Sequence, residues 1–441
     1  MYVNESLVKP IKVGHVVCTY RRENAIAKKI SEFSEPIPGH HLYIIDNGNT
    51  LVHTDNGNQT IVGSPNLGGS GGFSNGILRT LEDGCTHIIL NDDDAFISRE
   101  SVFRTVMFTA MLRPSYSDVS IAGTMLNINN PAIVYEAGSQ FRDGFIHSLK
   151  SGLDTSTDEG LIKLLGDEHI DCADWTFLCV PSSEIRKVGL PLPLFMHYDD
   201  IEYCLRMGNP IITLPGVYAW HPVFYDSFSP TNYYYNYRNR MVILSCSGGI
   251  PKGYIDRLCD KMGVEVAAYR YECCEEMIDG IRDYLEGPDH VFSLCRQGRR
   301  KGRTVDLQDI DELRKGLHII ESAPAASFRR RKLTLNGIMS RAVGDIESAP
   351  SDFDTAHFYR IDKVLYHVRD KGFITKRSRF RTISCAVRIT LLKHRMKRSA
   401  PSLVGEYRAS MGRYTSGEFW NELLKEQPEG PHDAVSIDER S

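Results

Sequence analysis

The segment His87-Ile88-Ile89-Leu90-Asn91-Asp92-Asp93-Asp94 joins an apolar run directly to three carboxylates. The run Ile88–Leu90 predicts a buried strand in the middle of a sheet. The acids then fall at the carboxyl end of that strand, where open α/β sheets place their ligands. Like charges this close repel one another, so the sequence predicts a cation among them.

Oxygen ligands of this kind favour Mg²⁺ or Mn²⁺, which commonly bridge a protein to a diphosphate. Side chains alternate along an extended segment, so we expect Asp92 and Asp94 on one side and Asp93 on the other. The structural alternative is an N-cap with an acidic first turn, because a helix could start near Ser98. The three acids alone leave both interpretations open.

The segments around this strand alternate between strand and helix patterns. Strands are predicted at Val13–Cys18 and Leu42–Ile45, and helices at Ala25–Phe33 and Ser74–Glu82. This order predicts an α/β fold with a mostly parallel sheet and helices on both faces. Polar residues follow each strand, as a nucleotide site requires.

The glycine-rich segment Asn66-Leu67-Gly68-Gly69-Ser70-Gly71-Gly72-Phe73 precedes the second helix. It does not follow the first strand, its spacing is not GxGxxG, and it lacks the lysine of a P-loop. Glycines let the backbone approach a ligand closely, and a helix start favours an anion. The alternative is a flexible loop without a ligand.

A second acidic centre lies at His197-Tyr198-Asp199-Asp200-Ile201, at the entrance to a predicted helix. Either acid could cap the helix, or one could serve as a general base that deprotonates an acceptor hydroxyl. His221 follows a strand predicted at Ile211–Leu214 and could complete a metal site, although a lone histidine is more often only hydrogen-bonded. The aromatic and arginine run Tyr233–Arg240 could contact sugars and phosphates, or pack a helix against the core.

Further strands are predicted at Val119–Leu126 and at the end of Asp171–Val180, a hairpin at Ile133–Phe141 and Gly144–His147, and a helix at Ser182–Val188. From about Pro251 helical patterns dominate, at Ile255–Met262, Val264–Leu285 and Leu307–Ile320.

Residues 295–398 contain 25 Lys and Arg against 11 Asp and Glu, with dense clusters at Arg329–Lys332 and Lys393–Arg398. Ile383, Val387, Leu391 and His394 recur at helical spacing. The pattern indicates a basic amphipathic helix on an anionic membrane surface, with nucleic acid or a simply solvated face as alternatives.

The chain has 441 residues and a hydrophobic fraction of 41%, which suits two or three domains, and its net charge of -4 indicates no particular class of partner. We expect a catalytic domain at 10–250, a mainly helical basic region at 251–400 and a polar, partly disordered tail at 401–441. The 11 cysteines form no CxxC pair, no signal peptide is evident and no segment has the length of a transmembrane helix. These features predict a cytoplasmic protein, peripheral on the inner face of the cell membrane.

Together the motifs resemble a known family. The set consists of Val17–Arg22, Ile45–Gly48, Asn66–Phe73, Asp92–Asp94, Trp175 and His197–Glu202. In this order and spacing it resembles the family-2 inverting glycosyltransferases with a GT-A fold, and most closely the bacterial galactofuranosyltransferases that use UDP-galactofuranose. The resemblance covers about residues 10 to 245.

The resemblance implies a role for each matched position. A UDP-sugar donor would contact Thr19, Tyr20, Arg21, Asp46, Asp93 and the segment Asn66, Gly68, Gly69, Gly71 and Gly72. Asp92, Asp94 and His221 would bind Mn²⁺ or Mg²⁺. Asp200, with Asp199 beside it, would be the base, and Trp175 and His197 would shape the site for a glycan or lipid-linked acceptor.

One position departs from the family pattern. A second Trp tends to follow the first in the galactofuranosyltransferases, and here the residue is Thr176. Acceptor and donor identity are therefore open, and dTDP-rhamnose or UDP-glucose are the alternative donors. A nonenzymatic nucleotide-sugar or membrane-scaffold protein would not need the base. A nucleic-acid binder would depend only on the basic carboxy-terminal half, and a homo-oligomer is compatible with the sequence.

Overall fold

The computed structural model describes residues 8–222, 228–351 and 358–425. Its centre is a mixed sheet in the order β3-β4-β2-β1-β5-β11-β7-β12-β6, with β8 paired to β7. The strands are β1 (Val13–Thr19), β2 (His40–Asp46), β3 (Thr54–Asp55), β4 (Gln59–Gly63), β5 (His87–Asp92), β6 (Phe96–Ile97), β7 (Ser120–Asn127), β8 (Asn130–Glu136), β11 (Leu178–Pro181) and β12 (Ile211–His221).

The apolar run of β5 lies in the middle of this sheet, as predicted. Ile88, Ile89 and Leu90 are completely buried, because β1 pairs parallel to β5 on one side and β11 pairs antiparallel on the other. Strands β4, β2, β1 and β5 run parallel, and β7 and β12 form a second parallel pair. The predicted α/β fold is confirmed.

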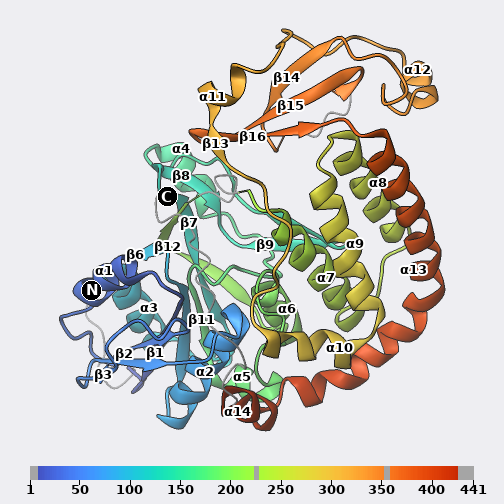
Figure 1. Ribbon diagram of the computed structural model, residues 1–441. Helices are drawn as coiled ribbons and strands as arrows, with labels where there is room; N and C mark the ends of the chain where they lie inside the picture. Colours follow the sequence, from blue (N-terminus) through green and yellow to red (C-terminus); the bar gives the residue numbers. More distant parts are fainter. Residues whose placement is uncertain (1–7, 223–227, 352–357, 426–441) are drawn as a thin grey trace.

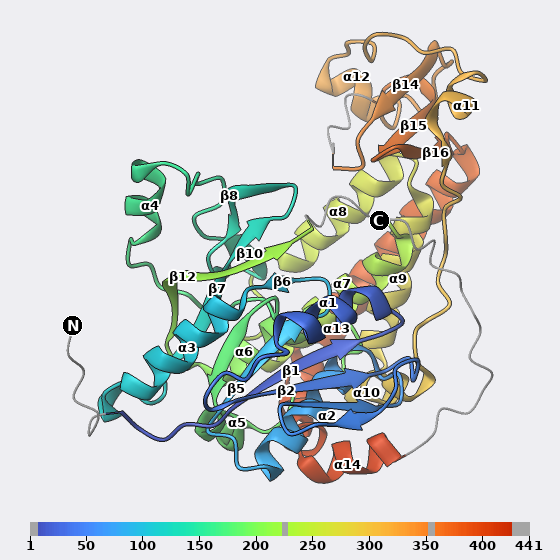
Figure 2. The same ribbon diagram turned by 90° about the vertical axis from the view of Figure 1, so that its left-hand side faces the viewer.

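Helices cover both faces of the sheet (Figures 1 and 2). One apolar layer joins β1 to α1 and α3 and includes Val17, Ile26 and Val102. The opposite layer joins it to α2, α5 and α6, with Phe73 and Ile185 among its members. These helices are α1 (Glu23–Glu32), α2 (Gly68–Glu82), α3 (Arg99–Met111), α5 (Ser182–Val188) and α6 (Asp199–Met207).

A helical layer follows the central sheet in the chain. It consists of α7 (Pro230–Cys246), α8 (Tyr254–Ala267), α9 (Tyr271–Leu285), α10 (Pro288–Ser293), η4 (Leu294–Gln297) and α13 (Arg379–Tyr414). Figure 1 shows α13 as the long outer helix around α7 to α9. The last helix, α14 (Gly417–Lys425), returns to α2, and the buried Trp420 indole donates to the carbonyl of Pro191 at 2.9 Å. Among the described residues, no helix combines the length and apolar character needed to cross a bilayer.

The carboxy-terminal region is rich in helices but also contains a four-stranded sheet that the sequence analysis did not predict. Its order is β13 (Gln308–Asp309), β16 (Lys371–Lys376), β15 (Ile361–Val368) and β14 (Gly344–Ser348). The short helices α11 (Ile310–Arg314) and α12 (Phe328–Leu333) flank this sheet (Figure 1).

Three sequence predictions differ from the structure. The helix predicted at Leu307–Ile320 is wrong, because β13 pairs with β16 and only the short α11 follows. The helix predicted at Val264–Leu285 is interrupted where Tyr269 adopts a left-handed backbone (φ +60°). The strand predicted at Ile133–Phe141 divides near Gly138 (φ +76°) into β8 and β9 (Ser139–Arg142), and β9 pairs with β10 (Phe145–Ser148).

Two remaining elements are α4 (Asp158–Leu164) and the short η2 (Pro114–Tyr116). Helix continues through most of residues 401–425, at the start of the predicted polar tail. Residues 426–441 lie outside the described residues.

Candidate functional site

The three consecutive acids lie at the carboxyl end of β5. Asp92 is the last residue of the strand, and Asp93 and Asp94 form the turn after it. Helix α3 is capped by Ser98, whose hydroxyl accepts from the backbone amide of Ser101 at 3.1 Å. The acids therefore do not cap this helix, and the capping alternative is wrong.

The ends of two other strands, β1 and β12, bring partners to these acids. From the segment after β1, Arg22 forms ion pairs with Asp93 at 3.0 Å and with Asp94 at 2.6 Å. The Thr19 hydroxyl, at the end of β1, donates to Asp93 at 2.8 Å. At the end of β12, His221 Nε2 lies 3.1 Å from Asp94 Oδ1. Asp93 and Asp94 thus have different partners apart from Arg22, which reaches both.

Burial and neighbouring charges shift the pKa values of these groups in different directions. Burial raises the pKa of Asp92 to about 7, and repulsion from Asp94 adds to the effect. Burial opposes ionisation of Asp94 too, but the hydrogen bond and charge of His221 and the charge of Arg22 hold its pKa below the usual value. Burial likewise opposes protonation of His221, yet its contact with Asp94 raises the pKa of the imidazole. Cationic neighbours therefore stabilise the Asp94 carboxylate.

The side chains present fit a divalent cation by their chemistry. Two carboxylates and an imidazole approach one another at the end of β5 and β12, and oxygen and nitrogen donors of this type bind Mg²⁺ or Mn²⁺. Within the described ranges, however, no group of three His, Cys, Asp or Glu side chains is already arranged to hold a metal ion. Repulsion among these three half-buried carboxylates favours a cation here.

The second acidic centre is the first turn of α6. Asp199 is buried, and a Cβ added to Gly69 would lie 3.1 Å from its Oδ2 atom. The Asp200 Oδ1 atom accepts from the backbone amide of Ile201 at 2.7 Å. Burial raises the pKa of both carboxyls to about 7, with Asp92 contributing at Asp199 and Asp199 contributing at Asp200. The two acidic centres are therefore electrostatically coupled.

The loop before α6 has an unusual backbone. Phe195, His197 and Tyr198 have φ values of +73°, +62° and +67°, although none is glycine. Such conformations are costly and persist only where surrounding contacts impose them. Asn239 Nδ2 on α7 donates to the carbonyls of Met196 and His197, each at 2.8 Å. This amide holds the loop that leads to the Asp199–Asp200 pair.

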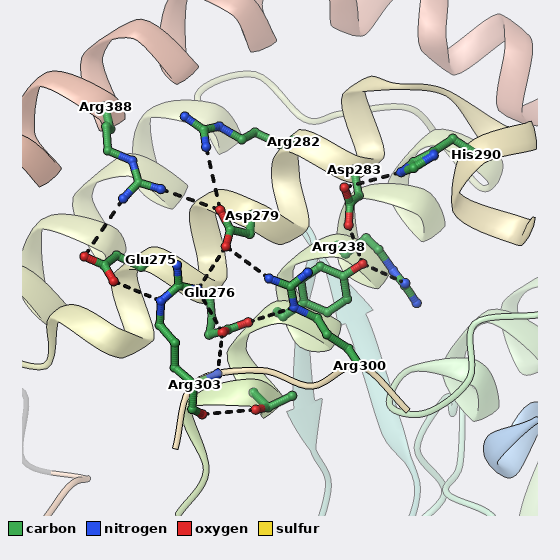
Figure 3. Close-up of polar contacts among 12 residues, drawn as sticks. Arg238, Glu275, Glu276, Asp279, Arg282, Asp283, His290, Arg300, Arg303 and Arg388 are labelled. Carbon is green, nitrogen blue, oxygen red and sulfur yellow. Dashed lines mark hydrogen bonds and ion pairs between the residues drawn. The ribbon is translucent and has the colours of Figure 1, made fainter. Parts of the chain in front are cut away.

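Helix α7 itself is held by the helices and the segment beneath it (Figure 3). Its Arg238 donates to the carbonyl of Leu194 at 2.7 Å. The Tyr234 ring of α7 stacks under the Arg300 guanidinium at 4.3 Å, and Arg300 pairs with the completely buried Glu276 at 3.2 Å. The Tyr233–Arg240 run therefore packs α7 against its neighbours and holds the loop before α6, as the core-packing alternative predicted.

The glycine-rich segment is largely helical, so the helix predicted from Ser74 starts earlier, at Gly68, and the flexible-loop alternative is wrong. Helix α2 begins at Gly68, and its glycines allow close packing. A Cβ on Gly72 would lie 2.1 Å from Cys18 Sγ, and one on Gly76 would lie 2.2 Å from a Val16 methyl. The amino end of α2 still faces the site, because Gly68 meets the carbonyl of Phe195 and Gly69 meets Asp199.

No family model matches the chain. The chain is 26% identical over 417 residues to galactofuranosyltransferase GlfT2 of Mycolicibacterium smegmatis, covering 84% of this chain and 63% of that protein. It is 28% identical to GlfT2 of Mycobacterium tuberculosis, covering 64% of this chain and 46% of that protein. GlfT1 of M. tuberculosis is 27% identical, with 53% of this chain and 82% of GlfT1 covered.

The chain is a relative of the galactofuranosyltransferases. The resemblance inferred from its motifs is thereby confirmed, while the chain spans less than two thirds of the length of either GlfT2. Solved structures show weaker likeness. S. aureus TarS has a TM-score of 0.40 at 13% identity, covering 64% of this chain and 50% of TarS. GalNAc-T7 with UDP, GalNAc and Mn²⁺ has a TM-score of 0.39 at 10% identity, covering 54% and 48%. The family relationship depends on the sequence relatives.

Other residues matched to the family have structural partners in the fold. The Asp46 carboxylate accepts from the backbone amides of Gly48, Thr50 and Leu51 at 2.7 to 2.9 Å, which shapes the turn after β2. Trp175 is buried between Phe73 and Tyr203, and its indole nitrogen has no hydrogen-bond partner among the described residues. The roles of Asp46 in binding the donor and of Trp175 in shaping the acceptor site stay predictions.

Of the remaining matched residues, Tyr20 and Arg21 lie between β1 and α1, and the Arg21 guanidinium lies 5.3 Å from the centre of the Tyr20 ring. Asn66 precedes α2, and its side-chain oxygen accepts from the Gly68 amide at 3.3 Å. Gly71 packs against its own neighbour, because a Cβ there would lie 2.3 Å from Leu67 Cβ. His197 is held through its carbonyl.

Sequence reasoning missed three residues of the site. Arg22 is the cation nearest to the acids, and its position directly after the first strand was the available signal. Lys29 is buried beneath them and donates to Asn91 Oδ1 at 2.7 Å. Asp174 is half-buried beside Asp200, and desolvation followed by neighbouring carboxylates raises its pKa well above the usual value. Long-range packing places Lys29 and Asp174, and no local motif indicated them.

Proposed function

We propose that the protein is a metal-dependent inverting glycosyltransferase that transfers galactofuranose from UDP-galactofuranose to a hydroxyl of a glycan or lipid-linked acceptor, in the synthesis of a cell-surface polysaccharide. The observation that carries the proposal is the meeting of two acidic centres at the carboxyl ends of β1, β5 and β12 in a relative of galactofuranosyltransferases.

The donor would lie across the ends of β1 and β5. Asp92, Asp94 and His221 would hold Mn²⁺ or Mg²⁺, which when bound neutralises charge on the departing UDP. Thr19, Asp93 and Arg22 are linked on the β1 side, where Tyr20 and Arg21 also lie. The amino end of α2 would favour the negatively charged diphosphate.

The acceptor hydroxyl would be deprotonated by Asp200 as it attacks the anomeric carbon from the face opposite the leaving UDP. Hydroxyl oxygen and anomeric carbon form the new bond, the bond to the UDP oxygen breaks, and the proton passes to the carboxylate. A single displacement of this kind inverts the configuration. The raised pKa of Asp200, about 7, suits a general base at neutral pH. Asp199 would support it, and Trp175 and His197 would shape the acceptor side.

The second candidate function is a glycosyltransferase that uses another donor, because Thr176 stands where the family tends to carry a second Trp. Thr176 is buried, so the side chain that packs at this position is smaller than the Trp of the family pattern. We include dTDP-rhamnose and UDP-glucose as donors for this reason. A lipid-linked acceptor would make the protein peripheral on the inner face of the cell membrane.

Calorimetry with UDP-galactofuranose, UDP-galactopyranose, UDP-glucose and dTDP-rhamnose, each with Mn²⁺ and with EDTA, tests the proposal. We expect tightest binding of UDP-galactofuranose and its loss in EDTA. Preference for another sugar nucleotide would keep the transferase and replace the donor. Absence of binding to all four, in protein that unfolds cooperatively, would favour a scaffold role instead.

A further inference from the structure

A lysine occupies a core-facing position of α1, where the helical pattern calls for an apolar residue. This helix buries two side chains against the sheet, Ile26 and, one turn later, Lys29. Lys29 is only 6% exposed. Lysine is rarely buried unless its charge is compensated, yet Lys29 forms no ion pair with another described residue. Its position therefore needs a reason beyond core packing.

The Lys29 ammonium joins the two ends of the turn that carries Asp92–Asp94, which we call the acidic turn. It donates to Asn91 Oδ1 at 2.7 Å and to the carbonyl of Ala95 at 2.5 Å. Asn91 comes directly before the three acids and Ala95 directly after them, and both residues are buried. One buried side chain thus clasps the acidic turn at both of its ends.

The near end of the acidic turn has further partners. Asn91 Nδ2 donates to the carbonyl of Thr176 at 2.7 Å, and His15 Nε2 on β1 lies 3.3 Å from Asn91 Oδ1. The backbone amide of Asp92 donates to the carbonyl of Trp175 at 2.8 Å. These contacts fix the start of the turn to the sheet. Lys29 adds the connection to Ala95, at the far end.

The clasp leaves the carboxylates themselves available to a metal ion. Both oxygens that Lys29 contacts are uncharged, whereas Arg22 binds oxygens of Asp93 and Asp94 directly. Burial lowers the pKa of Lys29 to about 8 against the opposing effect of the three carboxylates, so the ammonium is mostly charged at neutral pH. The ammonium and the acidic turn therefore also compensate each other's charge.

We infer that Lys29 is a positioning residue for the divalent cation, because it holds the acidic turn in the shape in which Asp92 and Asp94 can bind the ion. The inference rests on the proposed function in one respect, that Mn²⁺ or Mg²⁺ binds this turn. Residues that orient metal ligands from behind typically contribute about 10- to 100-fold to metal affinity. Charge alone would act in the opposite direction, because an ammonium repels the metal ion and its loss would tighten binding. The direction of the change thus distinguishes positioning from a simple charge effect.

Calorimetry of Mn²⁺ binding to the full chain, with and without saturating UDP, tests the inference. Lys29→Met keeps the length of the side chain but removes the ammonium and both hydrogen bonds. We expect the Mn²⁺ dissociation constant to rise roughly tenfold, at the lower end of the range for such residues. Lys29→Gln, which keeps a shorter and uncharged donor, is the second variant if Lys29→Met does not fold, and it should also weaken Mn²⁺ binding.

Two control variants separate positioning from general effects. Lys28→Met changes the exposed neighbour on the same helix and should leave Mn²⁺ binding unchanged. Arg270→Met removes another buried cation, which pairs with Glu265 at 2.6 Å, and should destabilise the fold without changing Mn²⁺ affinity. Urea unfolding with and without Mn²⁺ gives a second readout. Mn²⁺ should raise the unfolding midpoint less in the Lys29 variants than in the wild type.

Unchanged or tighter Mn²⁺ binding in Lys29 variants that unfold cooperatively would overturn the inference. Equal weakening by Arg270→Met would also overturn it, because the effect would then follow from destabilisation alone. The wild type separates this inference from the proposed function. Wild-type Mn²⁺ binding that the Lys29 variants retain in full would reject only the positioning role, whereas absence of Mn²⁺ binding in the wild type, even with UDP, would reject the metal dependence of the proposed transferase.

Discussion

Asn239 lies at the centre of α7, and its side-chain amide donates to the carbonyl of His197 at 2.8 Å, two residues before the acidic pair at the start of α6. The same amide also donates to the carbonyl of Met196. Two hydrogen bonds from one buried side chain therefore fix a loop in which His197 and Tyr198 have positive φ values. We regard Asn239 as a positioning residue for Asp200.

Asn239→Ala should lower transfer activity while leaving UDP binding nearly unchanged. Loss of two buried hydrogen bonds should also destabilise the fold by about 2 kcal/mol. The relevant measurements are the turnover rate at saturating donor, the affinity for UDP and the free energy of unfolding in urea. Asn421→Ala on the exposed face of α14 is the control. Unchanged turnover in Asn239→Ala would show that Asp200 does not depend on this clamp.

Gly68→Ala should disrupt the contact between α2 and the same loop. An added Cβ would lie 1.9 Å from the carbonyl oxygen of Phe195, and Gly68 has a φ of +73°. Gly84→Ala is a matched control, because its φ is +71° but an added Cβ there would meet nothing within 4 Å. Gly84→Ala should cost about 1 kcal/mol from the backbone conformation alone. Gly68→Ala should cost more and also reduce transfer; equal effects at both sites would contradict the close contact.

Some contacts in the site could be predicted from the sequence, and others could not. Asp94 and His221 could be expected to meet, because both follow strands that end at the same edge of a sheet. The glycine segment was misjudged, because glycine signals a loop locally, whereas here it lets α2 pack on Val16 and Cys18. The clamp by Asn239 and the position of Asp174 depend on packing between distant segments. A local pattern carries no information about such contacts.

Transfer should depend on pH through the acidic pair. A general base works when ionised, so with a pKa of about 7 for Asp200 the rate should fall as pH falls through 7 and level off above it. Below the midpoint the rate should drop about tenfold per pH unit. Transfer rates measured at saturating donor and Mn²⁺ between about pH 5 and about pH 9 would define the rising limb of the pH profile, because this range brackets the pKa of Asp200.

Glu136 provides an independent test of that assignment. Its charge contributes to raising the pKa of Asp200, so Glu136→Gln should move the midpoint of the rising limb to lower pH. The exposed Glu100 on α3 offers a control, and Glu100→Gln should leave the midpoint in place. If the midpoint is the same in Glu136→Gln as in the wild type, the limb reports the titration of a group away from Asp200.

Substitutions at Asp94 and at Asp200 should have separate effects, the first on UDP binding and the second on sugar transfer. Asp94→Asn should abolish the dependence of UDP binding on Mn²⁺, because it removes a charged oxygen ligand next to His221. Asp200→Asn should keep Mn²⁺-dependent UDP binding and lower transfer by roughly 100-fold or more, because it removes the base. Calorimetry and a transfer assay on both variants give the comparison. Mn²⁺-dependent binding in Asp94→Asn, or substantial turnover in Asp200→Asn, would reassign the respective role.

Glu276 should be a major determinant of stability away from the acidic centres. It is completely buried in α9 and pairs with Arg300 at 3.2 Å and Arg303 at 2.9 Å, as Figure 3 shows. Glu276→Gln removes the charge and leaves Arg300 paired with Asp279 and Arg303 paired with Asp279 and Glu275, so we expect a loss of about 3 kcal/mol. Glu312→Gln breaks an exposed pair with Lys315 and should cost no more than about 0.5 kcal/mol.

Urea unfolding of both variants measures this difference, and UDP calorimetry shows whether the site survives it. Because Arg300 stacks on Tyr234 of α7, a weakened anchor should also loosen the helix that carries Asn239. Glu276→Gln should therefore lower turnover more than UDP affinity, in the same direction as Asn239→Ala but by less. Destabilisation with unchanged turnover would mean that α7 holds its loop without help from the network beneath it.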